Sequence, residues 1–243
     1  RPPFPFEVLM VNLVGVSSTR AAQDALALRR VFETVHFESC PTTYNFHLHT
    51  VCSDGQLTPE TVMHQAIAIC LQGLSVTDHH TLDGYYQAQA WLAERQATHT
   101  DTTTRNLRLW TGIEVTAKLL GVDVHILGYA FDPTSPYLTP YLQHQAPALP
   151  DAHAAQVIRC IQVAGGLAVL AHPARYRRSP EELIAASVDL GIDGVETYYA
   201  YDHPKPWRPS PKQTEQMQRL SSKYGLLNTC GTDTHGSNLL QRL

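Results

Sequence analysis

Histidine and carboxylate side chains follow short apolar runs at several separate points of the chain. His47 and His49 come at the end of the run 44–48, and their spacing places both imidazoles on one face of an extended strand. Asp54 follows in a Cys-Ser-Asp-Gly turn, which can return a carboxylate to the same strand end. Similar runs lead to His79, Glu114, His172 and the pair Asp233 and His235. Imidazoles and carboxylates gathered in this way are typical of a site for divalent metal ions.

His125 extends this set. It lies on the run 122–127, the expected return strand of a hairpin, where its imidazole can approach Glu114. The set then holds six imidazoles and three carboxylates, more than the four ligands of a structural zinc site. Nitrogen donors combined with hard oxygen donors favour Zn, Mn or Fe over Ca or Cu(I). The sequence therefore predicts two or three bound divalent ions.

Alternating strands and helices would position these ligands. The expected strands cover residues 44–48, 74–77, 109–115, 122–127, 166–171, 191–196 and 226–230. The expected helices cover residues 18–35, 83–95, 150–163 and 210–224, and two more begin at Pro59 and Pro180. This alternation predicts an α/β fold, in which functional groups gather at the carboxyl ends of the strands. The stretches 98–106 and 132–145 are polar or broken by proline and are expected to be surface loops.

Residues 118–121 are too few for a crossover helix. The strands on either side are therefore expected to form a hairpin, which excludes a regular eightfold barrel. A length of 243 residues with 43% hydrophobic content supports one large domain. A formal net charge of −4 offers no general attraction for polyanions, so binding to extended duplex DNA is not expected.

The cysteines and the hydrophobic runs bear on the cellular compartment. Five cysteines without C-x-x-C pairing argue against a disulfide framework and favour a reducing compartment. Cys52 and Cys230 are interpreted as small buried hydrophobic residues. No apolar run approaches the roughly 20 residues that span a bilayer, and residues 1–10 lack signal-peptide features. A cytoplasmic protein without a membrane partner is the expectation.

Several motifs together resemble the PHP (polymerase and histidinol phosphatase) family of metal-dependent phosphoesterases, and most closely its small stand-alone nucleotide and oligonucleotide enzymes. They are HLHTVCSDG, TDHHT, GIE, HILGY, AHPARY and GTDTHG, and the resemblance spans residues 44–236. It implies a distorted seven-stranded (β/α)7 barrel in a phosphoesterase domain over residues 44–243. Residues 1–43 would form an N-terminal extension with a helix.

The resemblance also implies roles for individual residues. The metal ligands would be His47, His49, Asp54, His79, Glu114, His125, His172, Asp233 and His235. Glu114 would bridge two ions and act in catalysis with Asp233 and His235. Arg175 would hold the substrate phosphate, which suits its planar guanidinium. His80 and His203 are candidates for substrate binding or for protonating the leaving group, and metal-bound water is a third proton source.

This sequence departs from the family pattern in three places. Asn45 and His80 stand where an aspartate is common. Only about 46 residues separate His125 from His172, an interval into which close relatives often insert a small extra domain. A more open cleft is expected in its absence, so substrate selectivity does not carry over from the family.

The expected activity is metal-dependent hydrolysis of phosphate esters, in which a hydroxide held between the ions attacks phosphorus. The substrate would be a nucleotide 3′,5′-bisphosphate or the 5′ end of a short oligonucleotide. Two alternatives remain: a histidinol-phosphate-like or sugar phosphatase, and a non-catalytic, metal-stabilised interaction module. The oligomeric state and processivity are left open.

Some of these residues also have ordinary structural interpretations. Asp54 can cap the turn before the helix at Pro59, and His125 can be a hydrogen-bonded strand histidine. Arg175 can belong to a solvated basic stretch with Arg177 and Arg178. The tyrosines of residues 198–201 can either stack on a nucleobase or pack a strand end.

Overall fold

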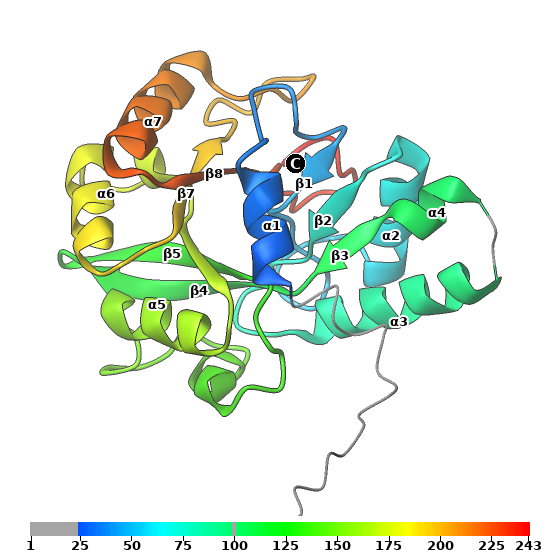
Figure 1. The fold of residues 1–243 in the computed structure, drawn as a ribbon, viewed down its shortest axis with the longest axis horizontal. Helices are drawn as coiled ribbons and strands as arrows, with labels where there is room; N and C mark the ends of the chain where they lie inside the picture. Colours follow the sequence, from blue (N-terminus) through cyan, green and yellow to red (C-terminus); the bar gives the residue numbers. More distant parts are fainter. Residues whose placement is uncertain (1–23, 99–100) are drawn as a thin grey trace, which may run out of the picture.

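The computed structural model describes residues 24–98 and 101–243, which form helices and strands in alternation (Figure 1). The strands are β1 (Tyr44–Asn45), β2 (Gly73–Ser75), β3 (Arg108–Trp110), β4 (Gly112–Leu119), β5 (Val122–Tyr129), β6 (Leu167–Leu170), β7 (Gly194–Tyr198) and β8 (Leu227–Cys230). The α-helices are α1 (Ala25–Phe32), α2 (Pro59–Ile69), α3 (Asp83–Thr98), α4 (Thr102–Asn106), α5 (Ala154–Val163), α6 (Pro180–Asp189) and α7 (Pro211–Tyr224). Two 3₁₀ turns are η1 (Pro136–Tyr141) and η2 (Pro173–Arg175).

The strands form two sheets. A short parallel sheet has the order β1-β2-β3, and a mixed sheet has the order β4-β5-β6-β7-β8. In the mixed sheet β5 runs antiparallel to β4 and β6, as expected for the hairpin, and the later pairs are parallel. Isolated bridges between Leu48 and Thr234 and between His79 and Glu114 connect the sheets at their carboxyl edges.

The predicted α/β class is confirmed, but the seven-stranded barrel is not. Among the described residues eight strands lie in two sheets without barrel closure. The expected strand 109–115 divides at Thr111, so that β3 belongs to one sheet and β4 to the other. Gly112 permits this passage, because a Cβ atom there would collide with the Ser75 side chain and the Val76 carbonyl.

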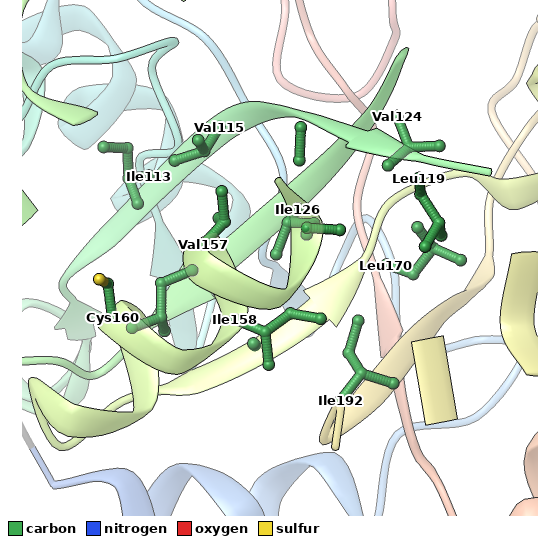
Figure 2. Close-up of a cluster of buried hydrophobic side chains, with 14 of the residues drawn as sticks. Ile113, Val115, Leu119, Val124, Ile126, Val157, Ile158, Cys160, Leu170 and Ile192 are labelled. Atoms are coloured by element: carbon green, nitrogen blue, oxygen red, sulfur yellow. The ribbon is translucent and has the colours of Figure 1, made fainter. Parts of the chain in front are cut away.

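The hydrophobic core has a large cluster under the mixed sheet. Ile113 and Ile126 from the β4–β5 hairpin pack with Val157 of α5 and Leu170 of β6 (Figure 2). A second cluster brings α1 onto the fold through Phe32, whose ring meets that of Phe46 edge-on at 5.0 Å between centroids. Burial of such side chains stabilises each by about 1.5–3 kcal/mol. These clusters fix the strands whose ends carry the polar residues.

Local signals place several helix boundaries correctly. Thr58 caps α2 ahead of Pro59, and Ser179 forms a capping box with Glu182 at the start of α6, as expected for residues of these types. In the predicted helix 18–35, α1 covers Ala25–Phe32, while residues 18–23 lie outside the described part of the chain.

The two predicted surface loops are partly wrong. The stretch 98–106 contains α4, which is capped by the Asp101 side chain. The stretch 132–145 contains η1, whose Leu138 and Tyr141 are buried in the large core cluster. In both places tertiary packing or a local cap outweighs polar composition.

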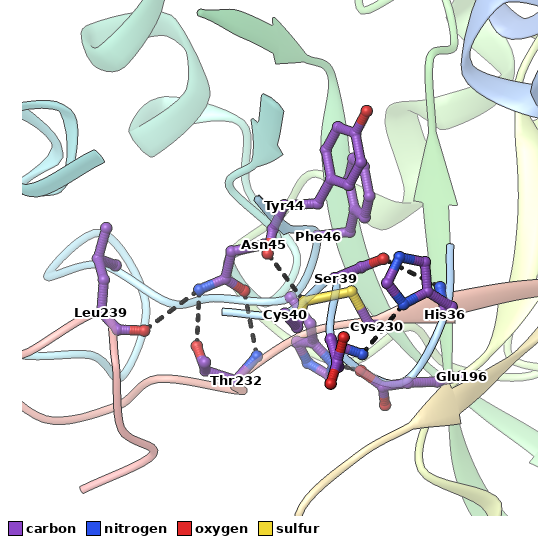
Figure 3. The surroundings of a disulfide bond; sticks show 12 residues. His36, Ser39, Cys40, Tyr44, Asn45, Phe46, Glu196, Cys230, Thr232 and Leu239 are labelled. Carbon is purple, nitrogen blue, oxygen red and sulfur yellow. Dashed lines mark hydrogen bonds and ion pairs between the residues drawn. A yellow bond between two sulfur atoms is a disulfide. The ribbon is translucent and has the colours of Figure 1, made fainter. Parts of the chain in front are cut away.

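A disulfide joins Cys40 to Cys230 and ties the segment before β1 to the end of β8 (Figure 3). Their Cα atoms are 6.0 Å apart although 190 residues separate them in sequence. The expectation of unpaired cysteines is therefore wrong for this pair, although Cys230 does lie buried in a hydrophobic cluster as expected, whereas Cys52 is only partly buried. Spacing along the chain carries no signal for a contact of such long range. Cys52, Cys70 and Cys160 are free thiols.

Within the described ranges 24–98 and 101–243, no helix combines the length and apolar character required to cross a bilayer.

Candidate metal centre

Two distant motifs lie side by side at the centre of the carboxyl edge. The segment after β1 carries His47 and His49, and the segment after β8 carries Asp233. Asp233 N–H donates to the His47 carbonyl at 2.8 Å, and His49 N–H donates to the Thr234 carbonyl at 3.0 Å. These backbone bonds bring the two histidines and the aspartate to one place, although more than 180 residues separate them.

The segment after β2 joins the centre of the site from the other side. Glu114 N–H donates to the Asp78 carbonyl, and His80 N–H donates to the Glu114 carbonyl, each at 3.2 Å. Asp78 also accepts hydrogen bonds from the Thr50 backbone N–H and hydroxyl, both at 2.7 Å. Asp78 therefore holds the histidine segment after β1 against the segment that carries His79.

Glu114 lies at the middle of the imidazole cluster. Its side chain is 1% exposed and stands on β4, which faces both sheets. The Glu114 Oε2 atom lies near Nε2 of His47 (3.1 Å), His49 (3.0 Å) and His79 (3.5 Å). The Oε1 atom lies near Nδ1 of His125 (2.8 Å) and Nε2 of His172 (3.3 Å). Each carboxylate oxygen thus serves a different set of imidazoles, which is the arrangement expected of a bridging ligand.

Asp54 and His235 complete the site on its solvent side. His235 Nε2 lies 3.2 Å from Asp54 Oδ2, and His79 Nε2 lies 3.8 Å from the same oxygen. The Asp54 side chain is 54% exposed, so this part of the site is open to water. All nine predicted ligands therefore come together, and their assignment as ligands stays a prediction.

The donor atoms fit divalent cations. His49 Nδ1 and Nε2, Glu114 Oε1 and His172 Nδ1 are buried without a hydrogen-bond partner among the described residues. The 2.8 Å approach of His125 Nδ1 to Glu114 Oε1 lacks hydrogen-bond direction. Such orphaned atoms are costly in a folded protein unless they bind water or an ion. Four overlapping groups of these side chains have ligand atoms within 4.8 Å of one another, which suits more than one ion.

The carboxylates of Glu114 and Asp233 are buried and negatively charged. Burial raises the pKa of Glu114, but His47 and His125 outweigh it and hold the pKa well below its ordinary value. Burial raises the pKa of Asp233, but the charge of His47 and the adjacent imidazole of His49 outweigh it and lower the pKa well below the usual range. Both carboxylates are therefore ionised at neutral pH, as a metal ligand must be.

Asp233 presents its two oxygens to different surroundings. Its backbone is left-handed, with φ of 53°. The Oδ1 atom lies 3.4 Å from His47 Nε2 and 3.3 Å from His49 Nε2. The Oδ2 atom accepts hydrogen bonds from Tyr199 Oη (2.7 Å), Arg175 Nη1 (3.1 Å) and Arg242 Nε (2.8 Å). Asp233 thus separates the imidazole cluster from a group of cationic side chains.

Glu196 belongs to the site, although no role was predicted for it. It is fully buried on β7, where Oε1 lies 2.8 Å from His47 Nδ1 and Oε2 accepts the His172 backbone N–H at 2.8 Å. A proton on His47 Nδ1 leaves Nε2 free for a metal. Glu196 ends the run 191–196, so the strand-end pattern that identified the other ligands was the signal available for it.

The three predicted substrate residues lie in different settings. Arg175 stands at the mouth of the site, in contact with Asp233. His80 is buried with Nε2 at 3.2 Å from the Thr116 hydroxyl, and burial lowers its pKa to about 4. His203 is exposed near Arg242 and Arg175, and burial followed by these two charges lowers its pKa. The charge of Arg175 thus acts on His203, whereas His80 faces Thr116.

Comparison with known proteins finds relatives over most of the chain. It is 32% identical to a 3′,5′-nucleoside bisphosphate phosphatase of Chromobacterium violaceum, across 79% of this chain and 86% of that protein. It is 24% identical to a 5′-3′ exoribonuclease of Haemophilus influenzae, across 79% of this chain and 89% of that protein. No protein-family model matches the sequence.

The fold has a solved counterpart. It superposes with a TM-score of 0.63 on a protein of Bifidobacterium adolescentis that is provisionally assigned as a metal-dependent phosphoesterase. The two chains share 24% identity, and the match covers 81% of this chain and 89% of the other. The alignment with the Chromobacterium phosphatase extends over 271 positions but includes only 79% of these 243 residues. That relative therefore has segments that this chain lacks.

Proposed function

The chain belongs to the PHP family of metal-dependent phosphoesterases, and on that premise we propose that it hydrolyses nucleotide 3′,5′-bisphosphates or the 5′ ends of short oligonucleotides. The observation that carries the proposal is Glu114, a buried carboxylate whose two oxygens face imidazoles on both sides. Five imidazoles surround this ionised carboxylate, and several of the buried ring nitrogens lack a hydrogen-bond partner among the described residues, a combination that is costly in a purely structural core.

Two or three divalent ions, Mn, Fe or Zn, would be held by the nine predicted ligands. His47, His49, Glu114 and Asp233 form one group of donors, and His79 with His125 and Glu114 forms another. The solvent-side group of His49, Asp54, His79 and His235 suits a third ion. Bound there, such ions lower the pKa of water to near neutrality and neutralise charge on phosphoryl oxygens.

The residues around the ligands then have distinct tasks. Glu196 orients His47 and the His172 backbone, which fixes the imidazoles before substrate arrives. Arg175 binds a phosphoryl oxygen, since its guanidinium is 40% exposed beside the ligand Asp233. His203 is the better placed of the two candidate proton donors, because it is exposed near Arg175 whereas His80 faces Thr116.

The substrate class rests on the two relatives. One relative is a 3′,5′-nucleoside bisphosphate phosphatase and the other a 5′-3′ exoribonuclease, and these activities favour a nucleotide or short oligonucleotide over a sugar phosphate as the substrate. We further propose residues 44–243 as the phosphoesterase domain and residues 1–43 as its N-terminal extension. The nine predicted ligands lie between His47 and His235, which supports this division, and the Cys40–Cys230 disulfide attaches the extension to the domain.

The test is release of phosphate or mononucleotide by Mn-loaded protein from a panel of substrates. The panel contains nucleoside 3′,5′-bisphosphates, short 5′-phosphorylated oligoribonucleotides, histidinol phosphate and simple sugar phosphates, with Glu114→Gln as the inactive control. Turnover of the nucleotides that depends on Glu114 supports the proposal. Preference for histidinol phosphate or a sugar phosphate contradicts it, and metal binding without any turnover favours the interaction module.

A further inference from the structure

A second guanidinium stands beside Arg175 at the mouth of the metal centre. Arg242 Nε donates to Asp233 Oδ2 at 2.8 Å, and Arg175 Nη1 donates to the same oxygen at 3.1 Å. The two side chains come from different segments of the chain: Arg175 from η2, and Arg242 from the segment after β8. The motifs in the sequence point to Arg175 only, so Arg242 is found by its tertiary contact.

The backbone fixes Arg242 firmly in this place. Its carbonyl accepts hydrogen bonds from the His235 N–H at 2.7 Å and the Gly236 N–H at 3.1 Å. The segment between them is anchored to α2, since Gln65 bonds to the Ser237 carbonyl and to the Leu239 N–H. These bonds hold the Arg242 backbone against the segment that carries His235, and a preorganised side chain loses little entropy when it binds a ligand.

Charge is unbalanced around Asp233. Two guanidiniums face one carboxylate, and the other oxygen of that carboxylate is turned towards His47 and His49. Among the described residues, the Arg175 guanidinium donates hydrogen bonds to Asp233 and Tyr199, and both of these side chains also attract Arg242. A guanidinium has five N–H donors, so most donors of the pair stay available for a ligand.

Both guanidiniums are accessible to solvent, and open space adjoins Arg175. The Arg175 side chain is 40% exposed and that of Arg242 is 15% exposed, so the pair reaches from solvent into the site. An open cavity of about 390 Å³ borders Arg175 on the side of Tyr176 and the hairpin residue Asp123. Two acids raise the pKa of the neighbouring His203: the predicted ligand Asp233 and the exposed Asp202.

We propose that Arg242 and Arg175 together bind a terminal, doubly charged phosphate group and thereby favour it over an internal phosphodiester. This inference rests on the proposed function, because it names the form of phosphate that the same site selects. Two guanidiniums match the charge and the several oxygens of a phosphate dianion, whereas a diester offers one charge and fewer free oxygens. Arg242 is a substrate-binding residue in this account.

The experiment measures binding and does not require turnover. Calorimetry on Mn-loaded protein compares inorganic phosphate, the dianion probe, with dimethyl phosphate, the diester probe. Arg242→Gln is expected to weaken phosphate binding about 10- to 100-fold, the range for a hydrogen bond to a charged group, and dimethyl phosphate binding less than about threefold. The phosphate affinity of Arg242→Lys is expected to lie between those of the wild type and Arg242→Gln, since lysine keeps the charge but lacks the planar guanidinium that donates two hydrogen bonds at once.

The controls separate this role from a structural one. Arg219→Gln removes a positive charge from an exposed position on α7 and is expected to leave both affinities unchanged. Bound manganese, counted by elemental analysis, is expected to stay at the wild-type value in Arg242→Gln. Loss of manganese would mean that Arg242 only positions Asp233, and equal weakening of the two probes would also overturn the inference. If Arg242→Gln fails to fold, Arg242→Lys is measured in its place, and wild-type phosphate affinity in that variant would overturn the inference.

Failure of the proposed function would look different. A protein that turns over no phosphoester, but binds phosphate in a manner that depends on Arg242, contradicts the hydrolytic proposal and supports the phosphate site. If the wild-type protein hydrolyses nucleotides but Arg242→Gln binds phosphate with unchanged affinity, the hydrolytic proposal is supported and the phosphate site is contradicted.

Discussion

The metal centre has a buried inner side and an open outer side. On the inner side His47, His172 and Glu196 are at most 2% exposed. On the outer side the side-chain exposures are 54% for Asp54, 29% for His125, 22% for His79 and 16% for His235. Glu114 stands between them and contacts imidazoles of both sides.

The difference indicates a division of labour. The inner side is held by the buried Glu196 of β7, which contacts both the His47 ring and the His172 backbone, so its ligands have one arrangement. The outer side takes its residues from the turns after β1 and β2, from β5 and from the segment after β8, and it is where water and substrate can enter. We therefore expect inner substitutions to change metal affinity and folding, and outer substitutions to change activity more than stability.

Glu114→Gln tests the residue that joins the two sides and should have the largest effect. The amide keeps the shape of the side chain but loses the charge shared with His47 and His125. We expect kcat to fall by about 1000-fold or more, the upper range for loss of one electrostatic group in an active site. Steady-state kinetics with circular dichroism as the folding control measures this, and wild-type turnover would refute the bridging assignment.

Removal of the metals should destabilise the protein strongly. Without ions, the carboxylates and orphaned imidazole nitrogens at the centre lose their common partner. Ligand present at about 1000 times its Kd contributes about 4 kcal/mol of stability. Thermal melts before and after chelation should therefore give a clearly lower Tm for the metal-free protein, restored by added Mn. An unchanged Tm would argue against a metal centre.

Glu196→Gln tests the inner side alone. The substitution keeps a hydrogen-bonding side chain but removes the charge that orients His47. Loss of such a partner typically weakens metal binding by about 10- to 100-fold, and we expect this range. Titration with Mn measures it, and Glu181→Gln on the surface of α6 is the matched control. Metal affinity equal to that of the control would show that Glu196 does not support the site.

Arg175→Ala tests substrate binding at the outer mouth. Because the side chain is 40% exposed and offers donors beside Asp233, we expect KM to rise about tenfold while the number of bound ions stays the same. Kinetics on a nucleoside bisphosphate and elemental analysis together decide this. Unchanged kinetics would return Arg175 to the interpretation of a solvated basic stretch with Arg177.

Asp54→Asn tests the most exposed ligand and should have the smallest effect on folding. Its side chain lies in the turn after β1 and contacts His235 and His79 from the solvent side. We expect the unfolding free energy of the metal-free protein to change by less than about 0.5 kcal/mol, as at most surface positions. Denaturant unfolding measures this, and a large loss would contradict the difference between the two sides.

The local sequence predicted much of this architecture. Spacing of two residues placed His47 and His49 together, and runs that end in His or Glu correctly marked the strand ends that meet. Thr58 and the Ser179–Glu182 pair marked helix starts that the structure confirms. These features depend on neighbours within a few residues, so they can be predicted from the sequence alone.

Other features were decided by packing across long separations. The run 109–115 looks like one strand, but Gly112 lets it pass close to Ser75, and it divides between two sheets. Polar composition favoured loops where α4 and η1 form. At Gly112 and in η1, contacts from remote parts of the chain outweighed the local preference, whereas α4 is started by the local Asp101 cap.

By itself the sequence determined which ligand types the site contains and that they fall at strand ends, because side-chain chemistry and local periodicity are properties of neighbouring residues. Only the tertiary structure brought Cys40 to Cys230, placed Glu196 behind His47, and set Arg242 beside Arg175. Each of these contacts joins segments whose spacing carries no local signal. Their proximity follows from how the two sheets pack, which depends on the whole core at once.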